Sequence, residues 1–176
     1  MANTLIIPPA GRINPGGDIG AIVAVSIRER IISAFEDAMA VVTLANGYHS
    51  DAGLDVVRCR KNLDPAELPC IVIWPGTETA ERREYGGQYC SMRMGIEAHC
   101  LFGSENPSIV SERMLADMIQ AVFGQDITSS ACDLADDILY ETGGTDSYPD
   151  AGDVAVGVKI SLVIKYNYLI GNPYSQ

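Results

Sequence analysis

The sequence contains few side chains that could perform catalysis. It has two histidines, His49 and His99, among 176 residues. His49, Ser50 and Asp51 are consecutive, but the members of a catalytic triad meet in space, and neighbours in an extended loop point apart. His99 stands beside Cys100, and adjacent side chains on a strand point to opposite faces. We therefore predict no catalytic residue and do not expect an enzyme.

Cysteine occurs in an odd number, five, without any C-x-x-C pair. Two of them, Cys90 and Cys100, share one face of a predicted strand and lie roughly 33 Å apart when that strand is straight. That separation excludes a disulfide between them. The pattern favours reduced thiols packed as small hydrophobic side chains, which implies synthesis in a cytosol.

Basic side chains are scarce: 12 Lys and Arg stand against 23 Asp and Glu, for a net charge of −11. This balance argues against affinity for nucleic-acid phosphates or anionic lipid, although DNA could still pass the surface without binding. The aspartates of segments 133–137 and 146–153 lack the spacing of a calcium loop. The glycines of segment 11–20 lack the Lys-Ser/Thr of a phosphate loop. We predict neither a metal nor a cofactor.

No apolar run is long enough to cross a bilayer, since Gly20 interrupts residues 19–25. We expect no signal peptide, because Met1–Thr4 carries no basic side chain and prolines follow. Residues 1–25 are predicted to form an extended arm, because they combine many prolines and glycines with aliphatic residues that disordered tails rarely keep. The apolar residues Leu5, Ile6 and Ile7 are expected to lie on the arm's own domain or on a neighbouring subunit.

The sequence is rich in alternating apolar and polar residues over 88–102 and 154–169, a pattern typical of strands with one buried face. Two amphipathic helices are also predicted. The first is capped by Ser26 and ends at Asn46-Gly47, and the second has Asn106 as its cap. Shorter strands are expected at residues 54–60, 70–74 and 138–142.

Polar connections complete the predicted domain. Residues 77–87 are interpreted as a loop or hairpin tip, and residues 143–153 as a turn-rich connection. The order of elements predicts one α+β domain over residues 26–176, with a mostly antiparallel, mixed sheet and two helices packed on one face. The arm and a protruding hairpin or loop extend from this domain.

The predicted loop contains the candidate interface residues Arg82, Arg83, Glu84 and Tyr85. Two interpretations remain open. The arginines could form surface ion pairs with neighbouring glutamates, which contribute little to stability. Alternatively they could contact another subunit, since arginine is favoured at interfaces. Trp74 is interpreted as a residue at the edge of the core rather than as a binding hot spot, and Tyr166 and Tyr168 are interpreted as core residues.

Several motifs occur in a characteristic order. In residues 67–76, Leu68-Pro69 leads into an apolar strand that Pro75-Gly76 closes. After it come Glu112–Asp117 in the second helix, then Asp137–Tyr140, and finally Asn172-Pro173-Tyr174. Over residues 26–174 this arrangement resembles tail terminator proteins of long-tailed bacteriophages, the group related to the minor tail protein U of phage lambda.

The resemblance implies a structural virion protein, made in the cytoplasm of a bacterial host and located at the neck of the phage tail. Such a protein forms a ring, hexameric in this family, that caps the head-proximal end of the tail tube and stops its polymerisation. The implied partners are further copies of the chain, the tail tube protein and the head–tail connector or stopper protein, with no membrane. DNA would pass through the lumen without specific binding, helped by an acidic inner wall.

Other roles remain open. The chain could be a head–tail connector or a tail tube subunit, which share compact sheet-and-helix designs. A small cytosolic hydrolase would have to use Cys90 or Cys100 with a histidine as its base. A small-ligand binding module would need a convergent polar pocket, which the sequence does not reveal.

Overall fold

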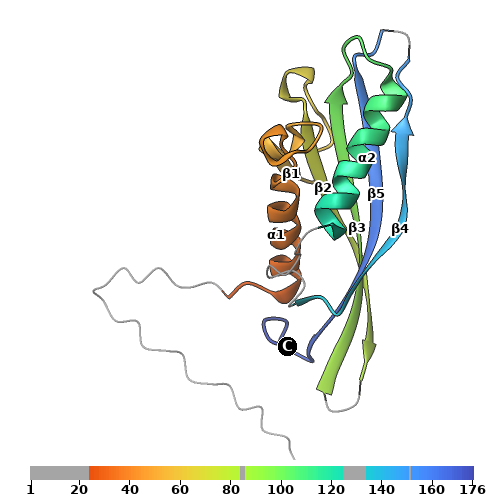
Figure 1. Cartoon of the computed structure of the whole chain (residues 1–176). Coiled ribbons are helices and arrows are strands. Elements are labelled where there is room, and N and C mark those ends of the chain that lie inside the picture. Colours follow the sequence, from red (N-terminus) through yellow and green to blue (C-terminus); the bar gives the residue numbers. More distant parts are fainter. Residues whose placement is uncertain (1–23, 84–85, 125–133, 151) are drawn as a thin grey trace, which may run out of the picture.

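The computed structural model describes residues 24–83, 86–124, 134–150 and 152–176. Its elements are α1 (Ile27–Ala40), β1 (Val56–Arg58), β2 (Cys70–Arg82), β3 (Gly87–Leu101), α2 (Pro107–Phe123), β4 (Asp137–Ser147) and β5 (Ala155–Leu169). The strands form one sheet in the order β1-β2-β3-β5-β4. β1 and β2 are parallel, and the other neighbouring pairs are antiparallel. Both helices cover the same face of the sheet (Figure 1). The predicted α+β fold is confirmed.

Both helices begin at the predicted capping residues. The Ser26 hydroxyl accepts a hydrogen bond from the Glu29 amide at 3.2 Å. The Asn106 side chain accepts one from the Ser108 amide at 2.9 Å. Each bond satisfies an amide that has no partner within the first turn of its helix. Pro107 occupies the first helical position of α2, as predicted.

α1 ends earlier than predicted, at Ala40 rather than at Asn46-Gly47. The chain turns there because the Gly53 amide donates to the Val42 carbonyl at 2.8 Å and draws the following segment across the end of the helix. Gly47, with a φ of +88°, instead ends a separate 3-10 turn at Leu44–Asn46. Asn46-Gly47 is thus a genuine C-terminal signal, but of the 3-10 turn and not of α1.

The alternation of β3 and β5 separates their side chains as predicted. The face under the helices buries Cys90, Met92, Met94, Ile96 and Ala98 from β3, and Val156, Val158, Ile160, Leu162, Ile164 and Tyr166 from β5. Helix side chains such as Ile31, Phe35, Met114 and Met118 complete this core. The opposite side of the sheet, which we call the open face, carries Arg93, Gly95, Glu97 and His99 from β3 and Lys159, Ser161, Val163 and Lys165 from β5.

β2 is much longer than predicted. Instead of ending at Pro75-Gly76 it continues to Arg82, with a bulge in its pairing to β3 between Pro75 and Glu78. A proline is tolerated there because β1 pairs only with Ile71–Ile73, so β3 is the one described strand beside β2 at Pro75. Of the two interpretations of residues 77–87, the hairpin is confirmed, because β2 and β3 form a projecting hairpin (Figure 1). Most of this segment is strand rather than tip.

The other short strands also differ from the prediction. β1 covers only Val56–Arg58, and β4 runs on to Ser147, so the first part of the predicted turn region 143–153 is strand. Gly143 and Gly144 hide the alternation of β4 in the sequence. The Thr145 hydroxyl bonds to Ser111 of α2 at 3.0 Å and fixes this part of the strand against the helix.

The C-terminal segment ties the sheet to the start of α1. The Pro173 carbonyl accepts a hydrogen bond from the Ile27 amide at 2.9 Å, and the Ile170 amide donates to the Gly86 carbonyl at 2.8 Å. The Asn-Pro-Tyr motif therefore fastens the last strand to the first helix.

Several predictions fall outside the described residues. These are residues 1–23 of the predicted arm, with Leu5, Ile6 and Ile7, and the loop residues Glu84 and Tyr85. No helix in the described part of the chain is long and apolar enough to cross a membrane.

Candidate functional site

Arg82 and Arg83 lie at the tip of the projecting hairpin and are exposed. The Arg83 guanidinium stands 4.3 Å from the centre of the Tyr89 ring, and the Arg83 amide donates to the Gly87 carbonyl at 2.9 Å. An exposed cation–π contact contributes about 0.5–1 kcal/mol. Tyr89 therefore holds one of the two candidate arginines against the tip of the hairpin.

A partly buried cluster anchors the hairpin to α1. The Glu78 carboxylate follows the β2 bulge and accepts a hydrogen bond from the Tyr166 hydroxyl. It also accepts one from Arg28 of α1 at 3.2 Å, and Arg28 bonds the Gly76 carbonyl at 2.8 Å. Burial and the Glu78 carboxylate raise the pKa of Tyr166 well above its ordinary value. Tyr166 is a core residue, as predicted, and its hydroxyl fixes the position of β2.

Among the described residues, three stretches of strand edge have no neighbouring strand. The outer side of β1 is one, but this strand is only three residues long. The two longer ones are the part of β2 beyond Trp74, because β1 pairs only with Ile71–Ile73, and the outer side of β4. Bulges interrupt these two longer edges and leave regular stretches at 78–82 on β2 and 137–140 on β4. Such edges present unpaired amides and carbonyls to another chain.

Glu97 organises the centre of the open face. Its carboxylate accepts hydrogen bonds from the Trp74 indole at 2.8 Å and from Lys159 at 2.6 Å, and the His99 ring lies 4.0 Å away. Burial lowers the pKa of His99, with Glu97 opposing that effect. Trp74 therefore lies half-buried on the open face, at the edge of the sheet.

Two further ion pairs cross the open face. Lys165 of β5 lies 3.3 Å from Asp137 of β4, and Arg93 of β3 lies 3.1 Å from Glu141 of β4. Cross-strand pairs of opposite charge stabilise a sheet modestly, by about 0.2–1 kcal/mol each. The open face is therefore polar, with its basic side chains held against carboxylates.

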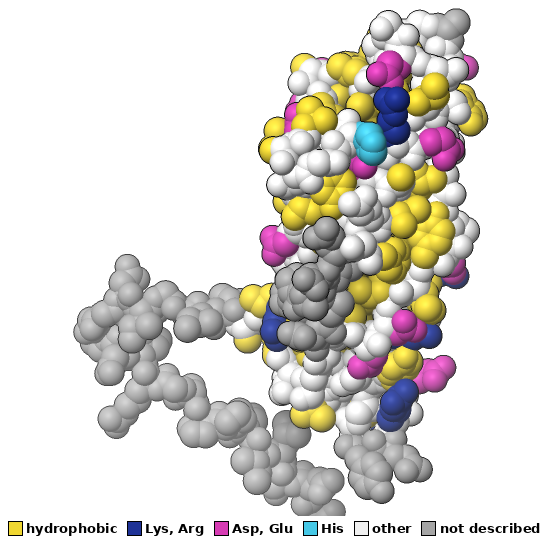
Figure 2. Space-filling view, in the orientation of Figure 1, with side chains coloured by type: hydrophobic (Ala, Val, Ile, Leu, Met, Phe, Trp, Pro, Cys, Tyr) yellow, Lys and Arg dark blue, Asp and Glu magenta, His cyan; other side chains and the backbone are white. Residues whose placement is uncertain are grey.

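The helix-covered side looks different. In Figure 2 apolar atoms gather along α2 and towards β4, while acidic and basic groups are scattered around them. Exposed apolar side chains on this flank include Phe123 and Tyr140, each 43% exposed.

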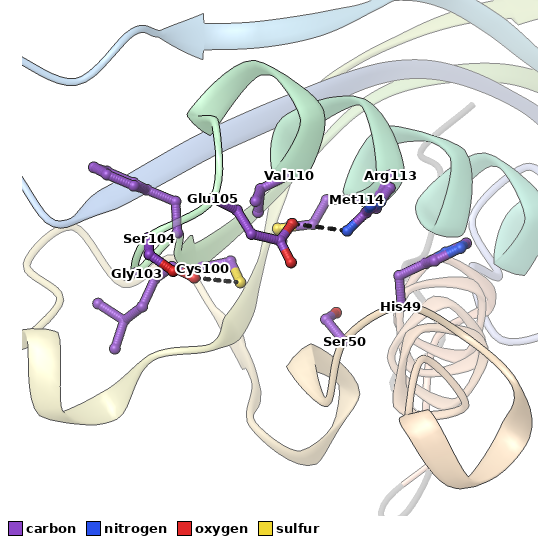
Figure 3. Close-up of a pocket in the computed structure, with 11 residues that line it drawn as sticks. His49, Ser50, Cys100, Gly103, Ser104, Glu105, Val110, Arg113 and Met114 are labelled. Carbon is purple, nitrogen blue, oxygen red and sulfur yellow. Dashed lines mark hydrogen bonds and ion pairs between the residues drawn. The ribbon is translucent and has the colours of Figure 1, made fainter.

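A cavity of about 390 Å³ opens between the loop after α1 and the start of α2. It is lined by residues that include His49, Ser50, Cys100, Glu105 and Arg113 (Figure 3). The last two form an ion pair at 2.8 Å. The His49 ring extends away from Ser50 and Cys100 in this view and bonds elsewhere. The cavity thus brings a cysteine and a histidine together without aligning them as nucleophile and base.

His49 instead pins its loop to α2. Its backbone amide and its ring Nδ1 both lie 2.8 Å from carboxylate oxygens of Asp117. Asp117 is a buried residue, with 2% of its surface exposed. Asp51 accepts from the Leu44 amide at 2.9 Å. The Ser50 hydroxyl accepts from the Ala52 amide at 3.4 Å, so each of the three consecutive residues bonds to a different partner.

The cysteines that a hydrolase would need are poor nucleophiles in this environment. Cys90 is fully buried, and burial raises its pKa to about 11. Burial also raises the pKa of Cys100, whose Sγ donates to the adjacent Leu101 carbonyl at 3.4 Å. A catalytic cysteine requires the opposite shift, because the thiolate is the attacking species. His99 and Cys100 lie on opposite faces, as predicted.

Within the described ranges, no three or more His, Cys, Asp or Glu side chains gather as a metal site requires. Asp136 bonds the Asn167 amide at 3.1 Å, and Asp153 accepts from the Asp150 amide at 2.8 Å. These carboxylates are used in local structure.

Sequence reasoning did not identify Glu78, Glu97 or Asp117 as key residues. Glu78 falls in the segment interpreted as a loop or hairpin tip, where the sequence does not define which face its side chain takes. Glu97 and Lys159 were each placed on the polar face, but their pairing depends on the β3–β5 register, in which they are direct neighbours. Asp117 was part of a helical motif, and its burial depends on a loop 68 positions earlier in the chain.

Comparison with models of known protein families and with curated proteins gives no match to this chain. The functional argument therefore depends on the residues and on the geometry described above.

Proposed function

We propose that this chain is a structural subunit of a bacteriophage tail, a tail terminator that forms a ring on the head-proximal end of the tail tube. Two long strand edges, on β2 and β4, that no other described strand covers support the proposal, together with the motif order at residues 67–76 and 172–174 that resembles this family. A head–tail connector or tube subunit would use the same edges, and the position of the ring in the particle distinguishes these roles.

The directions of the edge strands favour a closed ring. β2 and β4 run in opposite directions, because each neighbouring pair from β2 through β3 and β5 to β4 is antiparallel. A rotation about an axis along the strands would therefore place β4 of one copy antiparallel to β2 of the next. The register puts Asp137 level with Lys165, Ser91 and Thr79, so the two regular edge stretches overlap in height where 137–138 of β4 meet the level of 78–79 of β2. Heterologous contacts of this kind generate rings when the rotation closes.

The dimensions suit a bore for DNA. Four strands from each of six copies, spaced about 4.8 Å apart, give a circumference of about 115 Å and a diameter of about 37 Å before any strand tilt. Side chains reduce this width, but a duplex about 20 Å across still fits. The helices belong on the outside, where there is room for a second layer, and this places the open face towards the bore.

The two ends of the subunit differ chemically, as a ring between two partners requires. The hairpin tip presents Arg82 and Arg83. The other end exposes Leu54, Leu101 and Val154, which are 76%, 44% and 52% exposed. A cavity of about 400 Å³ beside Leu101 and Val154 is lined mostly by apolar residues. We propose that one end contacts the tail tube and the other the connector. The arm residues Leu5–Ile7 remain candidates for a contact with a neighbouring copy.

Disulfide trapping tests the ring. Thr79→Cys on the β2 edge and Leu139→Cys on the β4 edge should join neighbouring copies on oxidation and give a ladder that ends at one discrete ring size. The matched control pairs Thr79→Cys with Glu112→Cys on the exposed side of α2, and no ladder is expected from it. Equal ladders from both pairs, or a single dimer band from the edge pair, would contradict the proposed contact.

A further inference from the structure

The exposed cations at the centre of the open face share one arrangement. Three basic side chains, which we call the paired cations, each meet a carboxylate on another strand; they are Arg93, Lys159 and Lys165. Their partners, which we call the acidic partners, are Glu141, Glu97 and Asp137. The paired cations keep side-chain exposures of 69%, 42% and 31%, so solvent can reach them.

This arrangement differs from a simply acidic wall. The chain has nearly twice as many acidic as basic side chains, and yet this face places basic groups on β3 and β5, its two central strands. Lys159 and Lys165 are six residues apart on β5, or about 20 Å along the strand. Basic groups spaced along one face can follow a phosphate backbone, and each one that neutralises a phosphate strengthens binding through counterion release.

We infer that the acidic partners keep the paired cations from binding DNA, so that a duplex can slide along the open face. Each carboxylate occupies the position that a phosphate oxygen would otherwise take. The pairing of Lys159 is the tightest, because Glu97 is also held by the Trp74 indole and cannot easily swing away. This inference rests on the proposed function, because the proposed ring is what brings DNA to this face.

Removal of the acidic partners should therefore create DNA binding. The test uses the full chain with Glu97→Gln and Glu141→Gln, which frees Lys159 and Arg93 and leaves an amide oxygen for Trp74. Binding of a fluorescent duplex of about 25 base pairs is measured by anisotropy at several salt concentrations. Two additional phosphate contacts predict that the logarithm of the binding constant falls with the logarithm of the salt concentration with a slope of about −1.8. The single variant Asp137→Asn, at an exposed residue, repeats the test with Lys165.

A matched double variant controls for net charge. Glu36→Gln and Glu105→Gln each remove a carboxylate partner, from Arg58 and Arg113 respectively, and both pairs lie on the helix-covered side. We expect the open-face variant to bind the duplex at least about five-fold more tightly than this control at low salt. Equal affinities, or no gain over the wild type in the double and single open-face variants, would overturn the inference.

Native mass measured on the same samples separates this result from the ring. Rings without a gain in DNA binding would refute the role of the acidic partners alone. A gain in DNA binding without rings would support that role and count against the ring.

Discussion

Replacement of Glu78 by alanine tests how the projecting hairpin is held to the rest of the domain. The change leaves the Tyr166 hydroxyl, in a fully buried residue, without its acceptor. A buried polar group that loses its partner costs about 1–3 kcal/mol. The lost contact with Arg28 is partly exposed and adds about 1 kcal/mol or less. We expect a loss of about 2–4 kcal/mol in the free energy of unfolding, or roughly 5–12 °C in Tm for a domain of this size.

Urea unfolding followed by the fluorescence of Trp74 measures this loss, and a double variant tests its cause. Tyr166→Phe removes the hydroxyl that Glu78→Ala leaves without a partner. The double variant should therefore be more stable than the sum of the single effects predicts, by about 1–2 kcal/mol. Glu81→Ala, an exposed glutamate on the same strand, should change stability by less than about 0.5 kcal/mol. Strict additivity of the Glu78 and Tyr166 effects would refute the reasoning.

Three further predictions concern packing, pH and thiol reactivity. Gly53→Ala should lower the free energy of unfolding in urea by about 3 kcal/mol, because the new Cβ would lie 2.6–2.9 Å from three backbone carbonyl oxygens at the end of α1. The control Gly144→Ala places its Cβ in open space and should be tolerated. Similar losses for both variants would contradict this packing. Burial lowers the pKa of His99, so its contribution to stability is present above the ordinary value of about 6.5 and is lost as pH falls through the lower folded pKa. The fall in urea midpoint between pH 7.5 and 5.5 should therefore be smaller in His99→Gln, and an unchanged fall would count against this assignment. Exposed Cys59 should react with Ellman's reagent near pH 8 within minutes, while Cys90 reacts only after denaturation; rapid labelling of native Cys90, mapped by mass spectrometry, would revive the hydrolase alternative.

The parts of the fold that could be predicted were those with strong local signals. The alternation of β3 and β5 fixed their lengths and buried faces, and Ser26 and Asn106 marked both helix starts. The prediction ended the second strand at Trp74, because Pro75-Gly76 normally ends a strand, whereas β2 runs to Arg82. Its continuation depends on the absence of a β1 neighbour at that height, which is a property of the sheet and not of the local sequence.

The candidate site was less predictable, because it depends on register and on distant contacts. The polar residues of β3 and β5 were assigned to one face correctly. Their ion pairs could not be, since Glu97 meets Lys159 only through a particular alignment of the two strands. The anchoring of Glu78 joins residues 88 positions apart. Such contacts leave no periodic signal in the chain.

Electron cryomicroscopy of virions that contain this chain tests the central claim most directly. The proposal predicts one ring of copies at the junction of head and tail, with β4 of each copy beside β2 of the next and the helices outside. Stacked rings along the whole tail, or copies joined through surfaces other than these two edges, would contradict it.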